Sequence, residues 1–335
     1  MNLSQLKNAF RVFAVGTMMV VTPFAAQAGR LLVGDFNGDE SGVKAYDGTT
    51  GASQGTFVPF NSGGLTFPLG GAIGPDHNLY VSNSNNETVL RYNGATGAFL
   101  NIFVPEVDDP AALIFRSGFL YVASSSDPGS VSRFNATTGA FVDTFVAPGS
   151  GGLIDPEGMV FGPDGNLYVT NGSSVLRYNG TTGAFIDAFV APNSGGLVNT
   201  RGLAFAPDGN LLVGNFNFGG GGILEYNGTT GAFVGSFVPA GSGGLSSPRP
   251  LIFGPDGNLY VGDYGNGSVL RYNGTTGAFI NQFVPPGSGG LLGPTFLVFQ
   301  SSTVPDSSSA LSLLAISLAA LGFARLAGAH FSRSV

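Results

Sequence analysis

Short apolar runs recur along the middle of the chain and are separated by glycine-rich turns. Six of these runs align on Leu32, Tyr80, Tyr121, Tyr168, Leu212 and Tyr260, and a valine follows in every copy. Successive copies are 41 to 48 residues apart. Short runs of apolar and β-branched residues bounded by Gly, Asn, Asp and Pro are typical of β-strands. A period of this length built from such strands predicts the blades of a β-propeller.

One repeat illustrates the predicted blade. Its four strands cover residues 158–161, 166–170, 174–178 and 184–190. Pro-Asp-Gly and Asn-Gly lie between strands and suit tight hairpins, because Pro fixes φ while Gly and Asn accept positive φ. Ser-Gly-Gly-Leu then links most blades to the next, at residues 62–65, 150–153, 194–197, 242–245 and 288–291. The link between Val104 and Pro110 lacks this segment, which accounts for the shortest spacing.

Counting strands gives the number of blades. The strand of the Leu-Tyr-Val type occurs six times and begins with Leu31–Val33, whereas the strand that precedes it in each repeat last occurs at Phe296–Phe299. The repeat region therefore starts on a second strand and ends on a first strand. We expect an all-β, six-bladed propeller over residues 29–300, closed by pairing of its N- and C-terminal strands in one blade, because closure removes exposed strand edges.

The repeat resembles those of NHL-repeat and SMP-30/gluconolactonase-like propellers, most plainly over residues 155–169, Asp-Pro-Glu-Gly-Met-Val-Phe-Gly-Pro-Asp-Gly-Asn-Leu-Tyr-Val. The resemblance extends over residues 30–300 and implies the propeller fold. It does not imply one function, since these families include lactonases, lyases and pure binding modules.

Residues that break the repeat are the candidate site residues, because a residue that recurs in every blade serves the blade. The arginines of Val-Leu-Arg-Tyr and the aspartates of Pro-Asp-Gly recur, so we interpret them as solvated strand residues and turn residues. The position just before each first strand varies: it is Leu69, Ala111, Glu157, Arg201, Arg249 and Thr295. These six should converge at the mouth of the central channel, where Glu157, Arg201 and Arg249 form a predicted ligand site. Two guanidinium groups there favour a carboxylate-bearing ligand.

An alternative site follows from the resemblance. In SMP-30-like enzymes carboxylates and an Asn hold a divalent metal, and the matching positions here are Glu157, Asn215, Asp263 and Asp35. Such oxygen donors suit Ca²⁺. Asn215, Asp263 and Asp35 also belong to a ring of short polar residues at the ends of the second strands, completed by Asn83, Ser124 and Asn171, which we expect to bond the adjacent loop backbone. Phe36, Phe216, Phe218 and Tyr264 follow this ring or lie close to it, either stacking on sugar rings or packing between loops.

Composition narrows the function. The chain has two histidines and no cysteine, so a histidine-based triad and a disulfide framework are both excluded. Residues 29–305 contain nineteen Asp and Glu against nine Lys and Arg, a poor match for nucleic acid.

The two ends of the chain differ from the middle. Lys7 and Arg11 precede an apolar run that ends in Ala26-Gln27-Ala28, which indicates a signal peptide over residues 1–28, with an uncleaved anchor as the alternative. At the other end, residues 301–309 form a linker that contains Val304, Pro305, Asp306 and Ser307. An apolar segment follows from Ala310 and continues into a basic tail, so that residues 310–335 are expected to form a hydrophobic helix in the membrane.

This tail resembles the PEP-CTERM sorting signal in its Val-Pro-Asp-Ser variant, which exosortase-type proteases process; an ordinary membrane anchor is the alternative. The resemblance implies export to the periplasmic side of the inner membrane, then delivery to the cell surface or extracellular matrix. We therefore expect a noncatalytic module that binds an extracellular polysaccharide or a surface protein. A metal-dependent lactonase of the SMP-30 type is the alternative function.

Overall fold

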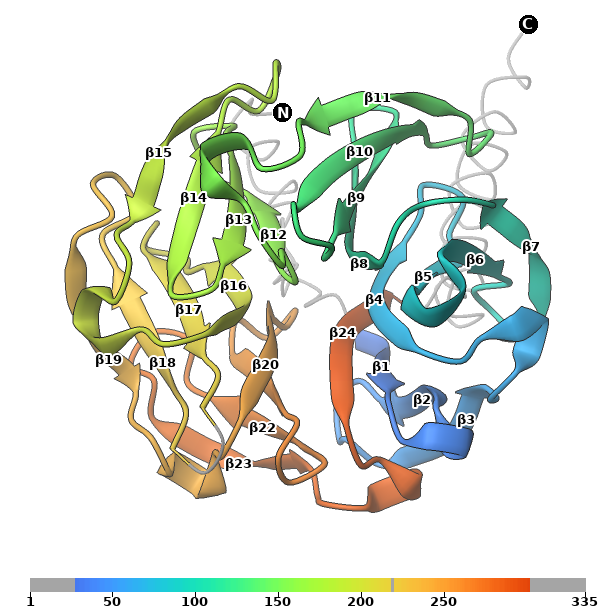
Figure 1. The fold of residues 1–335 in the computed structure, drawn as a ribbon. Coiled ribbons are helices and arrows are strands. Elements are labelled where there is room, and N and C mark those ends of the chain that lie inside the picture. The colour runs from blue at the N-terminus through green and yellow to red at the C-terminus, as the bar shows by residue number, and fades with distance from the viewer. Residues whose placement is uncertain (1–27, 218–219, 302–335) are drawn as a thin grey trace, which may run out of the picture.

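The protein is described by a computed structural model over residues 28–217 and 220–301. These residues form six four-stranded antiparallel sheets around a common centre (Figure 1), which confirms the six-bladed β-propeller. From inner to outer strand, the sheets are β24 (Pro294–Ser301), β1 (Ala28–Asp35), β2 (Gly42–Asp47), β3 (Ser53–Val58); β4 (Pro68–Ile73), β5 (Leu79–Asn83), β6 (Thr88–Tyr92), β7 (Phe99–Val104); β8 (Pro110–Arg116), β9 (Phe119–Ser124), β10 (Ser130–Asn135), β11 (Phe141–Val146); β12 (Met159–Phe161), β13 (Leu167–Asn171), β14 (Ser174–Tyr178), β15 (Phe185–Val190); β16 (Thr200–Phe205), β17 (Leu211–Asn215), β18 (Gly222–Tyr226), β19 (Phe233–Val238); β20 (Pro248–Phe253), β21 (Leu259–Asp263), β22 (Ser268–Tyr272), β23 (Phe279–Val284).

The sheet that holds β1 also holds β24. These strands pair antiparallel, with Leu31 opposite Phe299 and Val33 opposite Leu297. Each innermost strand contacts the innermost strands of both neighbouring sheets, in the order β4, β8, β12, β16, β20, β24 and back to β4. In Figure 1 the first strand, in blue, lies beside the last, in red.

The core lies between adjacent sheets. Leu31 and Val33 pack toward the sheet β20–β23, whereas Leu32, between them in sequence, packs toward the sheet β4–β7. Successive residues of a strand point to opposite faces, so a strand covered on both faces needs apolar residues at every position. This explains why the second strands read as continuous apolar runs rather than alternating ones.

Short 3-10 helices connect the blades or lie beside strand ends: η1 (Gly38–Glu40), η2 (Ser62–Gly64), η3 (Ser84–Asn86), η4 (Ser150–Gly152), η5 (Ser194–Gly196), η6 (Ser242–Gly244) and η7 (Ser288–Gly290). Five of them are the Ser-Gly-Gly links. In η4, for example, the Ser150 carbonyl accepts a hydrogen bond of 2.7 Å from the Tyr178 hydroxyl, and the following Leu153 is fully buried. Gly151 adopts a positive φ of 67°, and a Cβ there would collide with the Phe185 ring, so both geometry and space require glycine.

The third-strand arginines differ from the expectation that they are solvated. Arg177 donates from Nε and Nη2 to the two carboxylate oxygens of Asp187, at 3.1 and 2.5 Å, and its guanidinium lies 4.9 Å from the Phe189 ring centroid. Arg133 does the same with Asp143, and Arg91 pairs with Asp76. An aromatic ring and a carboxylate together hold each guanidinium against the blade, so these residues are half-buried parts of the scaffold.

The signal peptide predicted before Ala28 and the predicted sorting and helical segment after Ser301 lie outside the described residues. Among residues 28–217 and 220–301, no helix is long and apolar enough to cross a membrane.

Candidate functional site

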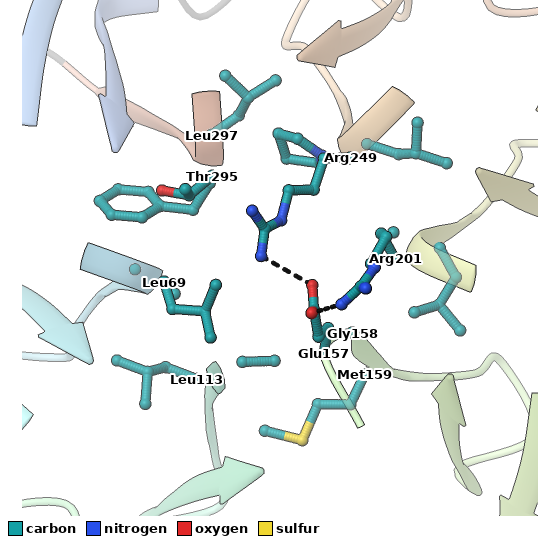
Figure 2. Close-up of a pocket in the computed structure, with 17 residues that line it drawn as sticks. Leu69, Leu113, Glu157, Gly158, Met159, Arg201, Arg249, Thr295 and Leu297 are labelled. Carbon is teal, nitrogen blue, oxygen red and sulfur yellow. Dashed lines mark hydrogen bonds and ion pairs between the residues drawn. The ribbon is translucent and has the colours of Figure 1, made fainter. Parts of the chain in front are cut away.

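The innermost strands of all six sheets surround a pocket of about 150 Å³ at one end of the central channel (Figure 2). Its rim, which we call the channel mouth, consists of Leu69, Glu157, Arg201, Arg249 and Thr295. These are five of the six off-repeat positions that the sequence places together; the sixth, Ala111, is buried behind the rim. Below the rim the wall is apolar and is made of Leu113, Met159, Leu203, Leu251 and Leu297.

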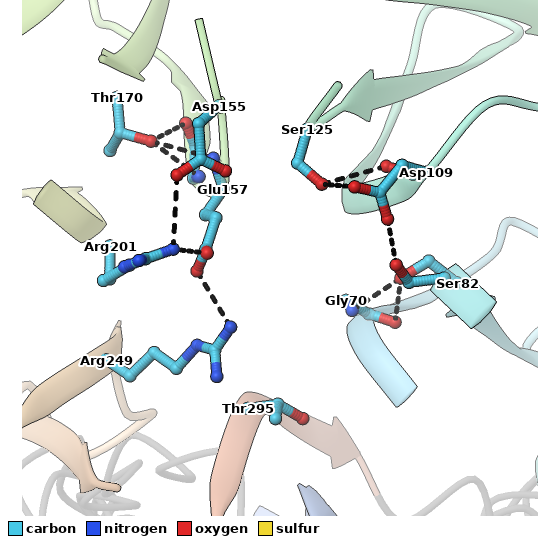
Figure 3. Close-up of polar contacts among 12 residues, drawn as sticks. Gly70, Ser82, Asp109, Ser125, Asp155, Glu157, Thr170, Arg201, Arg249 and Thr295 are labelled. Carbon is cyan, nitrogen blue, oxygen red and sulfur yellow. Dashed lines mark hydrogen bonds and ion pairs between the residues drawn. The ribbon is translucent and has the colours of Figure 1, made fainter. Parts of the chain in front are cut away.

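Glu157 is shared between the two arginines of the channel mouth. Its Oε2 accepts a hydrogen bond of 2.9 Å from Nη2 of Arg249, and its Oε1 forms an ion pair with Nη1 of Arg201 (Figure 3). The same Nη1 lies 3.7 Å from a carboxylate oxygen of Asp155. The three side chains of this network are mostly buried, with exposed fractions of 10% for Glu157, 12% for Arg249 and 19% for Arg201.

The strands around the channel mouth hold these side chains in place. Thr170, at the inner end of β13, accepts hydrogen bonds from the backbone N–H groups of Glu157 and Gly158, at 3.1 and 2.8 Å. Each arginine also lies against a ring from its own sheet. The guanidinium of Arg201 is 5.4 Å from the centroid of Phe216, and that of Arg249 is 5.2 Å from the centroid of Tyr264. Each cation is therefore held between a carboxylate and an aromatic face.

Burial sets the electrostatics of the channel mouth. It lowers the pKa of both Arg201 and Arg249 from the ordinary arginine value, and repulsion from Arg249 lowers the pKa of Arg201 further. Arginine nonetheless stays protonated in proteins, so both charges persist. Partial burial raises the pKa of Asp155, against the opposing effect of Arg201. Two cations thus share one well-buried anion, Glu157, and one half-exposed anion, Asp155.

The two arginines have unused donors. Nε of Arg201 is buried and has no hydrogen-bond partner in the described part of the chain. Arg249 donates to Glu157 through Nη2 and makes no further hydrogen bond with the described residues. A guanidinium carries five N–H donors, so the channel mouth retains the capacity to bind an additional acceptor.

The ring at the ends of the second strands serves the blade links, as the sequence indicated. Asn215 accepts from the backbone N–H of Val198 at 2.9 Å and donates to the carbonyl of Gly196 at 3.1 Å. The same role is filled by Asn83, Asn171, Asp263 and Asp35. Ser124 is the exception, because its blade has no Ser-Gly-Gly link; its hydroxyl lies 3.0 Å from that of Ser126.

This role uses the oxygens that the alternative metal site would need. Asp263 accepts from the backbone N–H groups of Ser246 and Ser247, and Asp35 accepts from those of Leu292 and Gly293. Glu157 is held by its two arginines. Within residues 28–217 and 220–301 there is no group of three or more His, Asp or Glu side chains that could hold a metal ion. The geometry therefore does not fit the Ca²⁺ ligand set of Glu157, Asn215, Asp263 and Asp35.

The candidate sugar-stacking aromatics pack within the protein. Phe36 lies 4.1 Å from the Phe67 ring, centroid to centroid, and Phe216 lies 6.3 Å from Tyr264. Phe216 and Tyr264 also lie against the two arginines, which favours packing between loops over a sugar platform. Phe218 lies outside the described residues. The role of Phe216 and Tyr264 was not predicted, although a signal exists: each follows the second strand of the sheet that carries one of the two arginines.

The fold resembles several solved propellers. A chain of a nidogen/laminin complex matches with a TM-score of 0.60 and 15% identity, over 82% of this chain and 99% of that chain. A gluconolactonase from Xanthomonas campestris matches with a TM-score of 0.54 and 16% identity, over 67% and 78%. Kuenenia stuttgartiensis hydrazine synthase matches with a TM-score of 0.54 and 18% identity, over 69% and 70%. At these identities the likeness shows the fold alone.

No protein-family model matches the chain, and no curated protein sequence matches it. The fold thus defines its class, a six-bladed β-propeller whose structural neighbours include both a gluconolactonase and a propeller from a laminin complex. The first of these belongs to the group that the repeat over residues 155–169 resembles.

Proposed function

We propose that the protein is a noncatalytic binding module that recognises a carboxylate-bearing extracellular polymer or surface protein at the channel mouth. The observation that carries this proposal is the pair of arginines that share Glu157 and keep unused N–H donors. Arginine binds carboxylates through two parallel hydrogen bonds, so a ligand carboxylate can use the donors that Glu157 leaves free. The pocket, of about 150 Å³, holds a single acidic group rather than a whole sugar chain.

The residues around the channel mouth support binding rather than catalysis. Its only carboxylates in the described chain, Glu157 and Asp155, both face arginines. A carboxylate paired in this way stays ionised and is a poor proton donor at neutral pH. The wall below the rim is aliphatic and offers no nucleophile. A lactonase-like hydrolysis would need the metal ligands that the blade links already use.

The binding proposal predicts that Arg201→Ala/Arg249→Ala loses retention on an immobilised acidic exopolysaccharide from the producing cell. We expect at least a tenfold loss of affinity, because each charge-assisted hydrogen bond is worth ~1.5–3 kcal/mol. Arg177→Ala, which removes an arginine that is already paired with Asp187, is the matched control and should bind like the wild type. A neutral polysaccharide should not be retained by any of these proteins. Equal retention of the double variant would refute the site, and thermal unfolding would verify that each variant is folded.

We further propose that the protein is exported and sorted. The apolar run before Ala28, the Val304-Pro305-Asp306-Ser307 motif and the hydrophobic segment from Ala310 support this proposal. The expected route is removal of residues 1–28, insertion of residues 310–335 in the inner membrane as a helix, and cleavage near the motif by an exosortase-type protease. The propeller then reaches the cell surface or extracellular matrix.

Intact-mass analysis of the protein recovered from the producing cell tests the sorting proposal. The expected N-terminus is Gly29, and the expected C-terminus lies within or just after residues 304–307. In a Pro305→Ala/Asp306→Ala variant the C-terminal segment should be retained and the protein should stay with the inner membrane. A wild-type protein that keeps Val335 at the cell surface would instead identify an ordinary membrane anchor.

We also propose that the pairing of β1 with β24 closes the ring and thereby fixes the width of the channel mouth. The antiparallel register between these strands, from Leu31 opposite Phe299 to Gly34 opposite Phe296, supports this proposal. Thr295, in the same strand, lies on the rim and donates a hydrogen bond of 2.6 Å to the Pro68 carbonyl of the neighbouring sheet.

A further inference from the structure

The outer strand of most blades is covered by a Ser-Gly-Gly link. Helices η2, η4, η5 and η6 lie against β7, β15, β19 and β23, and in each case the central glycine lies under the phenylalanine that begins the strand. A tyrosine of the third strand donates to the serine carbonyl at 2.7–2.8 Å. Helix η7 covers β3 in the same way, with Ser53 in place of the phenylalanine and Tyr46 as the donor.

The sheet β8–β11 is different. Its link runs from Val104 directly to Pro110 and contains no Ser-Gly-Gly helix. The third strand carries Phe134 where the other five sheets carry tyrosine, so the hydroxyl is missing in the sheet that has no serine carbonyl to receive it. The first residue of its outer strand, Phe141, is 60% exposed, compared with 38–44% for its counterparts Phe99, Phe185, Phe233 and Phe279.

A groove of about 540 Å³ lies where the link helix would be. Phe103 and Phe134 form a buried apolar floor, Phe141 and Pro105 form apolar walls, and Glu106 lies at the edge. Phe134 offers no hydrogen-bond donor, so the floor favours an apolar side chain over the peptide carbonyl that occupies the equivalent place in the other blades.

The edge of the groove is acidic. Glu106 is exposed and forms no ion pair within the described residues, and the link continues through the exposed Asp108. The backbone of the link is joined to that of Glu87, whose side chain is also exposed, by a hydrogen bond of 2.9 Å from Val107 N–H. The nearest arginine in sequence, Arg133, neighbours Phe134 in the same strand and therefore points to the opposite face of the sheet, where it pairs with Asp143.

We propose that this groove is a second binding site, which takes a segment of a partner protein with an aromatic or aliphatic side chain next to a lysine or arginine. The apolar side chain occupies the space that a link helix fills in the other five blades. The basic side chain pairs with Glu106. This site lies on the outer strand of one sheet, away from the channel mouth, so it does not depend on the binding function proposed there.

Selection of phage-displayed random dodecapeptides on the purified full chain tests this site. We expect the selected peptides to place an aromatic or aliphatic residue beside Lys or Arg. Titration of the synthetic peptides should show at least about a tenfold loss of affinity for Phe141→Ser, because a central aromatic side chain dominates such contacts. Glu106→Gln should lower the affinity about threefold and reduce its dependence on salt.

Two features keep the test decisive. Phe141→Ser introduces the residue that the first sheet carries at Ser53, so the variant is expected to fold, and its thermal unfolding verifies this. Phe233→Ser, at the same position of a covered blade, is the matched control and should bind the peptides like the wild type. Failure to select peptides, or equal affinity for Phe141→Ser, would overturn the proposal. So would a wild-type dimer in sedimentation velocity that Phe141→Ser dissociates, because the occupant would then be a second copy.

Discussion

Truncation of the chain after Gly293 is expected to abolish cooperative folding. The deletion removes β24, which supplies the inner strand of one sheet and the contacts of that sheet with β4 and β20. It also exposes the edge of β1 and uncovers Leu31 and Val33, which are fully buried. Phe296 and Leu297 alone are worth several kcal/mol, since loss of one large core side chain costs about 2–5 kcal/mol. The loss therefore approaches the whole stability of a domain, ~5–15 kcal/mol.

Truncation after Ser301 is the control, because it leaves every described strand in place. Thermal unfolding followed by circular dichroism should give a sharp transition for this protein and none for the shorter one. Addition of a synthetic peptide of residues 294–301 should partly restore the transition, as expected when a missing strand pairs with an open edge. A shorter protein that unfolds as cooperatively as the control would contradict ring closure by β24.

Replacement of Glu157 by glutamine is expected to destabilise the protein by roughly 3–5 kcal/mol, although the shape of the side chain is unchanged. The substitution removes the anion that Arg201 and Arg249 share and leaves two buried cations close together. Breaking a buried ion pair by removal of one partner has a cost of this size, because the remaining charge stays out of water without compensation. Urea unfolding of the wild type and the variant measures the difference.

Two further variants distinguish this explanation from a general effect of mutation. Asp155→Asn removes the half-exposed carboxylate that lies 3.7 Å from Arg201 and should cost less than about 1 kcal/mol. The double variant Glu157→Gln/Arg201→Leu should recover part of the lost stability, because only one cation remains and leucine already occupies the matching position at Leu69. Equal stability of Glu157→Gln and the wild type would mean that water, not Glu157, compensates the arginines.

The link helices explain how a shortened repeat can create a site. In five blades the glycines of the link bring a turn against the outer strand, and a tyrosine hydroxyl holds the serine carbonyl there. The blade β8–β11 has lost both members of this contact, the turn and the hydroxyl, and has kept the phenylalanine below them. A retained aromatic without its cover is the feature that distinguishes the groove from a neutral deletion.

The sequence by itself determined the blades and the positions that meet at the centre. Strand alternation, turn residues and the recurrence of Leu-Tyr-Val are local features, and six copies of them are enough to count the sheets and to place Leu31–Val33 opposite Phe296–Phe299. The same alignment brought Glu157, Arg201 and Arg249 to one end of the channel, because equivalent residues of a cyclic repeat lie on one circle. The polar ring that includes Asn215 was assigned correctly for the same reason, since its partners lie within its own repeat.

Only the tertiary structure decided what these side chains do. Glu157 and Arg249 are 92 residues apart and belong to different sheets, so whether the carboxylate pairs with an arginine or with a metal depends on side-chain directions across the channel. The packing of Phe216 and Tyr264 on the two guanidiniums, and the uncovered Phe141, likewise depend on the space between elements. Periodicity specifies where a residue lies on the ring, whereas packing and charge in three dimensions specify which neighbour it contacts.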